Sequence, residues 1–241
     1  MHTRFILIQP SHAGNVGAAA RAMKVMGFDD LVLVKPRWDD VLEREETIER
    51  ASGAVDVLQN ARAVETLDEA LEGLTHLCAT VMTARDFGPP TLAPREHLAQ
   101  VAAQQHGVGF LFGSERYGMR NDDVYRCHAA LQIPVNAEYG SLNLAAAIQV
   151  IAYEWRMALT DAVRAGPVEA VERADAQALA GMLAHWEQAL VDIGFLDPAA
   201  PKKLMPRLNQ LFNRAQPTPE EIHILRGVAK SMSEAAKKRR P

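Results

Sequence analysis

Two polar loops, each directly after a short apolar run, carry the residues of this chain that are best placed for ligand chemistry. The first loop is GSERYG at 113–118, after the apolar run GFLF at 109–112, and the second is NAEYGSLN at 136–143, after LQIPV at 131–135. In open α/β sheets, ligands bind at the carboxyl ends of strands, which is where both loops lie if the apolar runs are strands. The sequence therefore predicts one bipartite site for a small ligand.

The two loops offer different chemistry. The first pairs Glu115 with Arg116 between glycines that permit unusual backbone dihedrals, and it is either part of a site or a turn with an exposed ion pair. In the second, Ser141 is expected to cap the following helix, either as a plain cap or with free backbone N–H groups that bind a carboxylate or an adenine edge. Ser141 lies outside a G-x-S-x-G elbow, so a hydrolase triad is not indicated.

A third candidate is the run NVGAAAR at 15–21, in which Asn15 is expected to cap a helix and Gly17 to let backbone or ligand approach closely. The run only loosely resembles a dinucleotide fingerprint, because Lys35 ends the next strand where a ribose would need an acidic residue. Arg21, which stands among alanines, is either part of a site or a surface arginine on an amphipathic helix.

A fourth candidate is Arg85, which follows a strand-like run at 77–80 and either meets a phosphate or is a solvated loop residue. The two cysteines, Cys78 and Cys127, form neither a disulfide framework nor a zinc spacing, so buried free thiols are expected. No metal-ligand cluster stands out in the sequence, and no metal is expected.

The composition is that of an ordinary globular protein. The chain has 241 residues, of which 48% are hydrophobic and 23% charged, enough for one large domain or a medium domain with a small one. The apolar runs are far shorter than the roughly 18 residues of a membrane helix. The N-terminus, MHTRFILIQP, reads as a first strand rather than a signal peptide, so a cytoplasmic protein without membrane contact is expected.

Charge is distributed unevenly along the chain. The net charge is −4, but residues 202–241 hold ten Lys and Arg against three acidic residues, a net charge of +7, which leaves −11 for the rest. A basic tail on an acidic body suggests a polyanionic partner for the tail. The alternative is a solvated helix whose basic end aids solubility.

Strand-like and helical runs alternate through the first 160 residues, which predicts an α/β fold with a mostly parallel sheet. Strands are expected at 4–9, 31–34, 63–64, 77–80, 109–112 and 131–135. Helices are expected at 16–26, 43–58, 95–105 and 142–159, with a capping box at 66–69 and a short helix capped by Asn121. A linker at 161–177 precedes helices at 177–193, 202–213 and 218–237. We therefore expect a domain at 1–160 and a helical extension at 178–241.

Three ordered motifs connect these candidates to a known family. Asn15-x-Gly-Ala-x-x-Arg21, Gly113-x-Glu-Arg-x-Gly118 and Ile133-Pro-x-Asn136 with Ser141-Leu-Asn143-x-Ala145 resemble the motifs of the SPOUT (trefoil-knot) RNA 2′-O-methyltransferases of the TrmH class. The resemblance runs nearly from end to end. It is closest to the members of this class that methylate the ribose of cytidine or uridine 32 in the tRNA anticodon loop.

The resemblance implies a fold and a cofactor that spacing alone does not show. Segments near 109–112 and 131–135 would thread a deep trefoil knot, a rare exception among protein chains. S-adenosylmethionine would lie in the knot, and the active site would form at the interface of a homodimer that uses no metal. The residues that match the cofactor-binding positions are Thr80, Val81, Met82, Gly113, Ile133, Gly140, Ser141 and Leu142.

For such a methyl transfer, the chemistry of the matching residues suggests a role for each. Arg21 would stabilise the developing alkoxide and anchor a phosphate, since arginine is effectively never deprotonated, while a phosphate oxygen, Glu115 or water takes the proton. Ser141 and Asn143 would orient the ribose or Arg21, Asn15 would position the helix start, and Arg116 would serve the dimer interface. Phosphates of tRNA would be bound by Arg85 and by the basic residues of the extension, Lys202, Lys203, Arg207, Arg214 and Arg226.

Alternatives remain open at this stage. A knotted methyltransferase of this class can act on another tRNA position or on rRNA, and a relative that has lost activity can still bind RNA. A nicotinamide-linked oxidoreductase is disfavoured, because the acidic ribose ligand is missing. The sequence leaves open whether cytidine, uridine or both are accepted, and whether the whole tRNA is needed.

Overall fold

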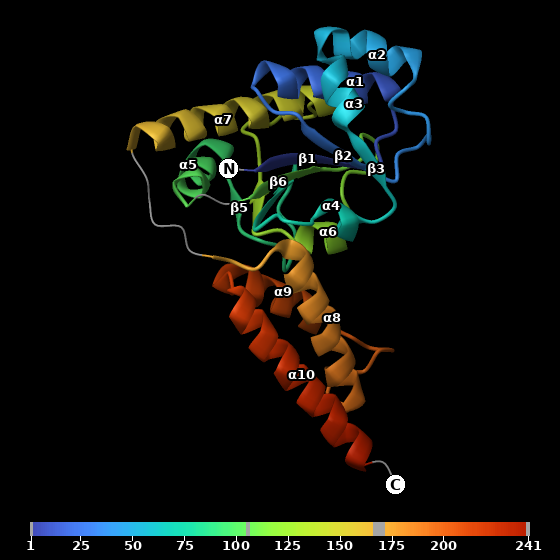
Figure 1. Ribbon diagram of the computed structural model, residues 1–241, viewed down its shortest axis with the longest axis vertical. Coiled ribbons are helices and arrows are strands. Elements are labelled where there is room, and N and C mark those ends of the chain that lie inside the picture. Colours follow the sequence, from blue (N-terminus) through green and yellow to red (C-terminus); the bar gives the residue numbers. More distant parts are fainter. Residues whose placement is uncertain (1, 105–106, 166–171, 240–241) are drawn as a thin grey trace.

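A parallel β-sheet forms the centre of the larger part of the molecule (Figure 1). The computed structural model describes residues 2–104, 107–165 and 172–239. Seven strands are hydrogen-bonded in the order β3-β2-β1-β6-β4-β7-β5, and all of their pairings are parallel, which confirms the predicted fold class. The strands are β1 (Thr3–Ile8), β2 (Asp30–Val34), β3 (Arg62–Val64), β4 (His76–Thr80), β5 (Thr91–Leu92), β6 (Val108–Phe112) and β7 (Ala129–Leu131).

Helices cover both faces of the sheet, as a parallel sheet requires. The helices α1 (Ala13–Val25), α5 (Pro94–Ala103) and α7 (Leu144–Ala165) pack on one face, with α2 (Glu45–Ala51) and α3 (Val55–Asn60) outside α1 (Figure 1). The other face carries α4 (Leu67–Ala70) and α6 (Asn121–Tyr125). Successive residues of β1 divide between the two cores: Phe5 packs in the α1–α7 core, and Ile6 in the opposite one.

The C-terminal helices form a separate layer below the sheet (Figure 1). They are α8 (Ala176–Asp192), α9 (Leu204–Ala215) and α10 (Pro219–Arg239). Leu179, Met182 and Ile222 are buried where α8 and α10 lie side by side. The buried Asn213 joins this layer to the sheet, because its side-chain amide donates hydrogen bonds of 3.3 Å to the carbonyl oxygens of Tyr125 and Cys127. The helical extension thus docks through polar contacts as well as apolar ones.

Several element boundaries differ from the sequence prediction. The helix expected at 43–58 is divided, because Ser52 adopts φ 53° and starts the short 3-10 helix η1 (Ser52–Ala54) between α2 and α3. The strand expected at 131–135 ends at Leu131, so residues 132–143 form one long loop. Arg120 rather than Asn121 is the N-cap of α6, without a side-chain cap. The capping box predicted at Thr66 is present, with Glu69 as its partner.

The segment expected as a linker at 161–177 is partly helical. Helix α7 continues to Ala165 and α8 begins at Ala176, while residues 166–171 lie outside the described residues. Lys202 and Lys203 precede α9 rather than lying within it, contrary to the helix expected at 202–213. Within the described part of the chain, none of the helices has the length and apolarity needed to cross a membrane.

Candidate active site

The candidate active site is built around Glu115, which lies in the loop after β6. One carboxylate oxygen, Oε2, accepts hydrogen bonds from the backbone N–H of Ser11 at 2.8 Å and from its hydroxyl at 2.7 Å. The other, Oε1, accepts a bond of 2.9 Å from the side-chain amide of Asn15. Because β1 and β6 are adjacent and parallel, the loops at their carboxyl ends meet, and Glu115 joins them.

Asn15 extends this cluster to a third loop. Its Oδ1 accepts a hydrogen bond of 2.9 Å from Nδ2 of Asn143, which ends the long loop 132–143. The expected capping role of Asn15 is wrong: α1 begins at Ala13, so Asn15 stands inside the first turn and its side chain turns outward to its neighbours. The sequence predicted that these residues belong to one site, and the structure places them in one hydrogen-bonded network.

The cap of α7 is Asn143 and not Ser141. Oδ1 of Asn143 accepts hydrogen bonds from the backbone N–H groups of Ala145 at 2.9 Å and Ala146 at 3.4 Å. An asparagine at this position satisfies donors that the helix itself leaves free. Ser141 is exposed in the loop, two residues earlier in the chain. Asn143 therefore does two things with one amide: it starts α7 and holds Asn15.

The surroundings of Glu115 keep it ionised. Partial burial raises the pKa of its carboxyl, but the hydrogen bonds from Asn15 and Ser11 lower it by more, so that the pKa lies below its ordinary value. A carboxylate that has a low pKa and already accepts three hydrogen bonds is a weak proton acceptor. Its chemistry is that of a positioning group. Of the proton acceptors that the sequence left open, Glu115 is the one that this geometry disfavours.

Arg21 is exposed on the outer side of α1. Within the described part of the chain, no hydrogen bond or ion pair is found for its guanidinium. Asn15 and Arg21 are six residues apart, so at 100° per residue their side chains leave α1 about 120° apart. Arg21 is therefore directed away from the Glu115 cluster of its own chain. Arg116 is also exposed, with its guanidinium 5.2 Å from the ring centre of Tyr117.

A pocket of about 660 Å³ lies beside this cluster, at the carboxyl ends of β4 and β7. Its size falls in the range of small-molecule sites. Loop 132–143 supplies much of the wall, and the ends of β4 and β5 together with Ala147 of α7 supply the rest. Six of the residues expected to bind the cofactor line it: Thr80, Val81, Met82, Ile133, Gly140 and Leu142.

Gly113 and Ser141, the other two expected cofactor residues, are not among the residues that line the pocket. Glycine is required at position 113 for a steric reason, because a Cβ there would lie 2.2 Å from the carbonyl carbon of Gly118. The loop 113–118 closes on itself through a bridge between Ser114 and Gly118, and Gly118 has φ +66°. Both glycines are thus needed to shape the loop that presents Glu115.

The basic residues expected to bind RNA fall into two groups. Lys203 and Arg207 both lie over the ring of Phe87, with the cationic groups 5.6 and 5.4 Å from its centre. Phe87 belongs to the loop after β4, which also carries Arg85, whose guanidinium donates to the hydroxyl of Thr83 at 3.1 Å. We call Arg85, Phe87, Lys203 and Arg207 the basic patch. It links the extension to the loop that borders the pocket.

The other expected RNA-binding residues lie apart from this patch. Arg226 donates a hydrogen bond of 3.3 Å to the carbonyl oxygen of Ala178, so it contributes to the contact between α8 and α10. Arg214 lines a second pocket, below the sheet, and Lys202 is exposed with φ 51°. Ser11 was not among the residues predicted from the sequence, although a polar residue in the loop after the first strand was a usable signal.

Comparison with known proteins defines the class. The SpoU rRNA Methylase family model matches residues 2–153, and the model of the C-terminal domain of the tRNA methyltransferase TrmJ matches residues 177–241. Together with the parallel sheet and the Glu115 cluster, the first match makes this a SpoU-type methylase and confirms the predicted SPOUT fold class.

The full-length matches are more specific. The chain is 44% identical over 242 residues to the tRNA (cytidine/uridine-2′-O-)-methyltransferase TrmJ of Klebsiella pneumoniae, with 97% of each chain covered. It is 42% identical over 233 residues to the TrmJ of Pectobacterium atrosepticum, with 95% of each covered. The crystal structure of TrmJ from Z. mobilis ZM4 superposes with a TM-score of 0.83 at 34% identity, covering 96% of this chain and 99% of that one. The chain belongs to the TrmJ family.

Proposed function

We propose that this protein transfers a methyl group from S-adenosylmethionine to the ribose 2′-hydroxyl of cytidine or uridine 32 in the tRNA anticodon loop. One observation carries the proposal: loop 132–143 lines the 660 Å³ pocket and, through Asn143, is also hydrogen-bonded to the Glu115 cluster. The relatives named as tRNA (cytidine/uridine-2′-O-)-methyltransferases support the reaction and the substrate class.

The pocket residues fit S-adenosylmethionine. Ile133 and Leu142 supply apolar surface, and Thr80 and Asn136 supply polar groups beside it. Gly140 leaves no room for a side chain, since a Cβ there would lie 2.8 Å from Cγ2 of Val135. When bound, S-adenosylmethionine supplies a methyl group activated by a sulfonium leaving group. The protein has to hold the hydroxyl in line with this methyl and favour the loss of its proton.

The chain's own residues can meet both demands. Arginine is not deprotonated in proteins, so the role of Arg21 is to stabilise the negative charge that develops on the ribose oxygen. Both carboxylate oxygens of Glu115 already accept hydrogen bonds, and its pKa is lowered. The proton of the ribose hydroxyl would therefore pass to water or to a phosphate oxygen of the RNA. Glu115, Asn15 and Asn143 then act as positioning residues that hold three loops in register. Ser141 is exposed, so its hydroxyl would be free to orient the ribose.

We infer that the active site is completed by a second copy of the chain. Arg21 projects away from its own Glu115 cluster, on a face of α1 where Val25 is 65% exposed. Helix α7 packs against α1 and exposes Tyr153 and Met157. Exposed apolar side chains on two adjoining helices, one of which carries Arg21, are what a homodimer interface would cover. In such a dimer, Arg21 of one protomer would face the pocket of its partner.

The basic patch is the proposed start of the tRNA surface. Lys203 and Arg207 of the extension pack over Phe87, whose loop continues from the pocket residues Thr80 and Met82. Phosphate contacts of this kind orient an RNA without reading its sequence, so the extension at 178–241 would position the anticodon stem and the first domain would select the nucleotide.

Incubation of the purified protein with labelled S-adenosylmethionine and unmodified tRNA, followed by mapping of methylated riboses, tests this function. The expected product is one 2′-O-methyl group at position 32, which is lost on tRNA with 2′-deoxyribose at that nucleotide. Methylation at another tRNA position or on rRNA would establish the alternative substrate instead. Cofactor binding by calorimetry without any methylation would identify an inactive RNA-binding relative.

A further inference from the structure

Three residues with metal-binding side chains meet near the opposite end of β4 from the cofactor pocket. His76 and Cys78 come from β4, and His97 comes from α5. One ligand atom from each lies within 4.8 Å of the other two. Nε2 of His76 is 3.1 Å from Nε2 of His97. His76 and Cys78 are buried, and His97 is half-buried.

The fold, not the sequence spacing, creates this cluster. Residues 76 and 78 share one face of β4 because side chains alternate along a strand. His97 reaches them from a helix that begins after β5, two strands away from β4 in the sheet. The sequence shows only a His-x-Cys pair and a distant histidine, which explains why no metal-ligand cluster was expected there.

We propose that His76, Cys78 and His97 bind one divalent cation of the zinc type, with a fourth position open to solvent. Two imidazoles and a thiolate are a ligand set that favours zinc over the harder cations. Zn–N bonds of about 2.0 Å and a Zn–S bond of about 2.3 Å in a tetrahedron put ligand atoms roughly 3.3–3.6 Å apart. The two Nε2 atoms, 3.1 Å apart, are already close to this spacing, and a ligand atom at the 4.8 Å limit would have to approach by about 1.3 Å.

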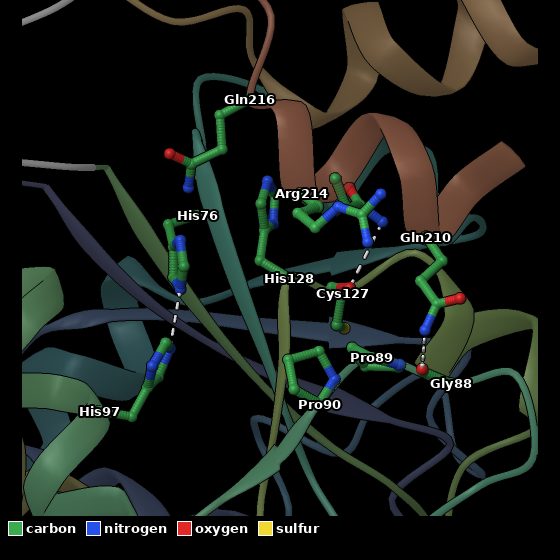
Figure 2. A pocket seen from close by; sticks show the side chains of 11 residues that line it. His76, Gly88, Pro89, Pro90, His97, Cys127, His128, Gln210, Arg214 and Gln216 are labelled. Atoms are coloured by element: carbon green, nitrogen blue, oxygen red, sulfur yellow. Dashed lines mark hydrogen bonds between the residues drawn. The ribbon is translucent and has the colours of Figure 1, made fainter. Parts of the chain in front are cut away.

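A pocket below the sheet gives the cation an entry path. Its volume is about 400 Å³, and His76, His97 and His128 lie in its wall (Figure 2). Figure 2 shows His76 directed at His97, with His128 alongside, under the end of α9 that carries Gln216. The fourth ligand would be a water molecule or a small anion from this pocket.

His128 is a neighbour of the site and not a ligand. Its Nδ1 accepts a hydrogen bond of 3.0 Å from the backbone N–H of Leu77, so the neutral ring carries its proton on Nε2. Its ring centre is 4.8 Å from that of His76. Such a packed imidazole restricts the rotation of His76, as groups beside a metal site commonly do.

Binding of the cation forms one metal–sulfur and two metal–nitrogen bonds and releases the thiol proton to solvent. The site would then join β4, whose last residue Thr80 lines the cofactor pocket, to α5, which begins directly after the pocket residue Ala93.

The competing explanation is a packed histidine pair with a plain hydrogen bond, and cobalt spectroscopy separates the two. Protein without a histidine tag is stripped with chelator and titrated with Co²⁺. The proposal expects a single equivalent bound, tetrahedral ligand-field bands and a thiolate-to-cobalt charge-transfer band, all reversed by Zn²⁺. Cys78→Ala should remove the charge-transfer band, and His97→Ala should weaken binding by about tenfold or more.

His223→Ala is the matched control, because His223 is exposed on α10 and belongs neither to the cluster nor to the wall of the pocket beside it. It should leave the cobalt spectrum and affinity unchanged. Circular dichroism of each variant shows whether it is folded. Absence of tetrahedral bands in the wild-type protein overturns the proposal, and so does a spectrum that His97→Ala and Cys78→Ala leave unaltered. The readout is independent of methyl transfer, so it stands or falls separately from the proposed function.

Discussion

The side-chain amide of Asn143 donates a hydrogen bond of 2.9 Å to Oδ1 of Asn15, although 128 residues separate the two in the chain. Asn15 uses its other amide atom, Nδ2, to donate to Glu115. Only one orientation of the Asn15 amide lets Nδ2 donate to Glu115 while Oδ1 accepts from Asn143. The bond to the Glu115 carboxylate therefore fixes Oδ1 of Asn15 as the acceptor for Asn143. The loops after β1, β6 and β7 are thereby held as one unit.

Asn15→Asp tests this unit, because it keeps the acceptor for Asn143 and replaces the donor to Glu115 with a second carboxylate. Two facing carboxylates repel, and the loop that carries Glu115 should shift. We expect the methylation rate to fall about 100-fold, the scale on which small misplacements act. Single-turnover rates and cofactor calorimetry measure the two effects separately. Asn121→Asp makes the same charge change at an exposed position and should be neutral; equal rates in both variants would contradict the role of Asn15.

The pKa of Glu115 predicts a defined pH dependence of stability. Its pKa lies below the ordinary value of 4.5, since hydrogen bonds from Asn15 and Ser11 outweigh the effect of burial. The carboxylate therefore contributes its full stabilisation above about pH 4.5 and loses it as the pH falls through the folded-state pKa. Urea denaturation should show that Glu115→Gln lowers the free energy of unfolding by a constant amount from about pH 5.5 to 7, and by less at lower pH.

Glu138→Gln is the control for this measurement, because Glu138 is exposed in loop 132–143. Its difference from the wild type should stay small at every pH. A Glu115→Gln difference that grew on acidification would mean that the carboxyl is protonated more easily in the folded state than in the unfolded one, against the hydrogen-bond pattern.

Gly17 is required by the contact between α1 and α2. A Cβ at this position would lie 1.9 Å from the carbonyl oxygen of Thr47, which belongs to the α2 backbone. Gly17→Ala should therefore destabilise the protein by more than about 2 kcal/mol, although alanine is the better helix former. Gly227→Ala in α10 is a matched control, since nothing lies within 4 Å of a Cβ there. It should stabilise by up to about 1 kcal/mol. Thermal unfolding of both variants checks this, and an unchanged Gly17→Ala midpoint would contradict the close contact.

These residues show what the sequence does and does not determine. Alternating apolar and helical runs were enough to predict the parallel sheet, because it depends on local periodicity. Of the two polar loops expected to form a ligand site, only the second lines the pocket. The choice between Ser141 and Asn143 as the cap of α7 was predicted wrongly. Both residue types cap helices well, and the structure selects Asn143 through its bond to Asn15, far away in the chain. The cluster of His76 and His97 likewise depends on how β4 and α5 pack, which no local pattern encodes.

The basic patch predicts a salt-dependent contribution to tRNA binding. Lys203→Ala and Arg207→Ala should each weaken tRNA binding at low salt and reduce the slope of log affinity against log salt by about 1. Cofactor binding should be unaffected. Filter binding over a range of salt concentrations measures both quantities. Lys237→Ala, an exposed lysine near the end of α10, serves as the control. If Lys203→Ala and Arg207→Ala kept the wild-type slope, as the control should, the RNA would have to bind elsewhere.

Arg21 should affect the chemical step and leave the fold intact. Its side chain is exposed, so Arg21→Ala should unfold at the wild-type temperature and bind the cofactor normally while methylating about 10²–10³-fold more slowly. Lys24→Ala is the control: Lys24 is an exposed cation on the same helix whose partner is Asp56. Near-full activity of Arg21→Ala would remove Arg21 from the mechanism.

A mixed dimer tests whether Arg21 acts on the partner's pocket. One protomer carries Arg21→Ala, and the other carries Gly140→Val, which fills the cofactor pocket next to Val135. If Arg21 acts across the interface, the intact pocket of the first protomer receives the intact arginine of the second, and about half of the wild-type activity returns. If Arg21 serves its own chain, each site lacks one component and the mixed dimer stays inactive. Differently tagged chains, purified in two steps, provide the sample. The outward direction of Arg21, about 120° around α1 from Asn15, predicts the recovery of activity.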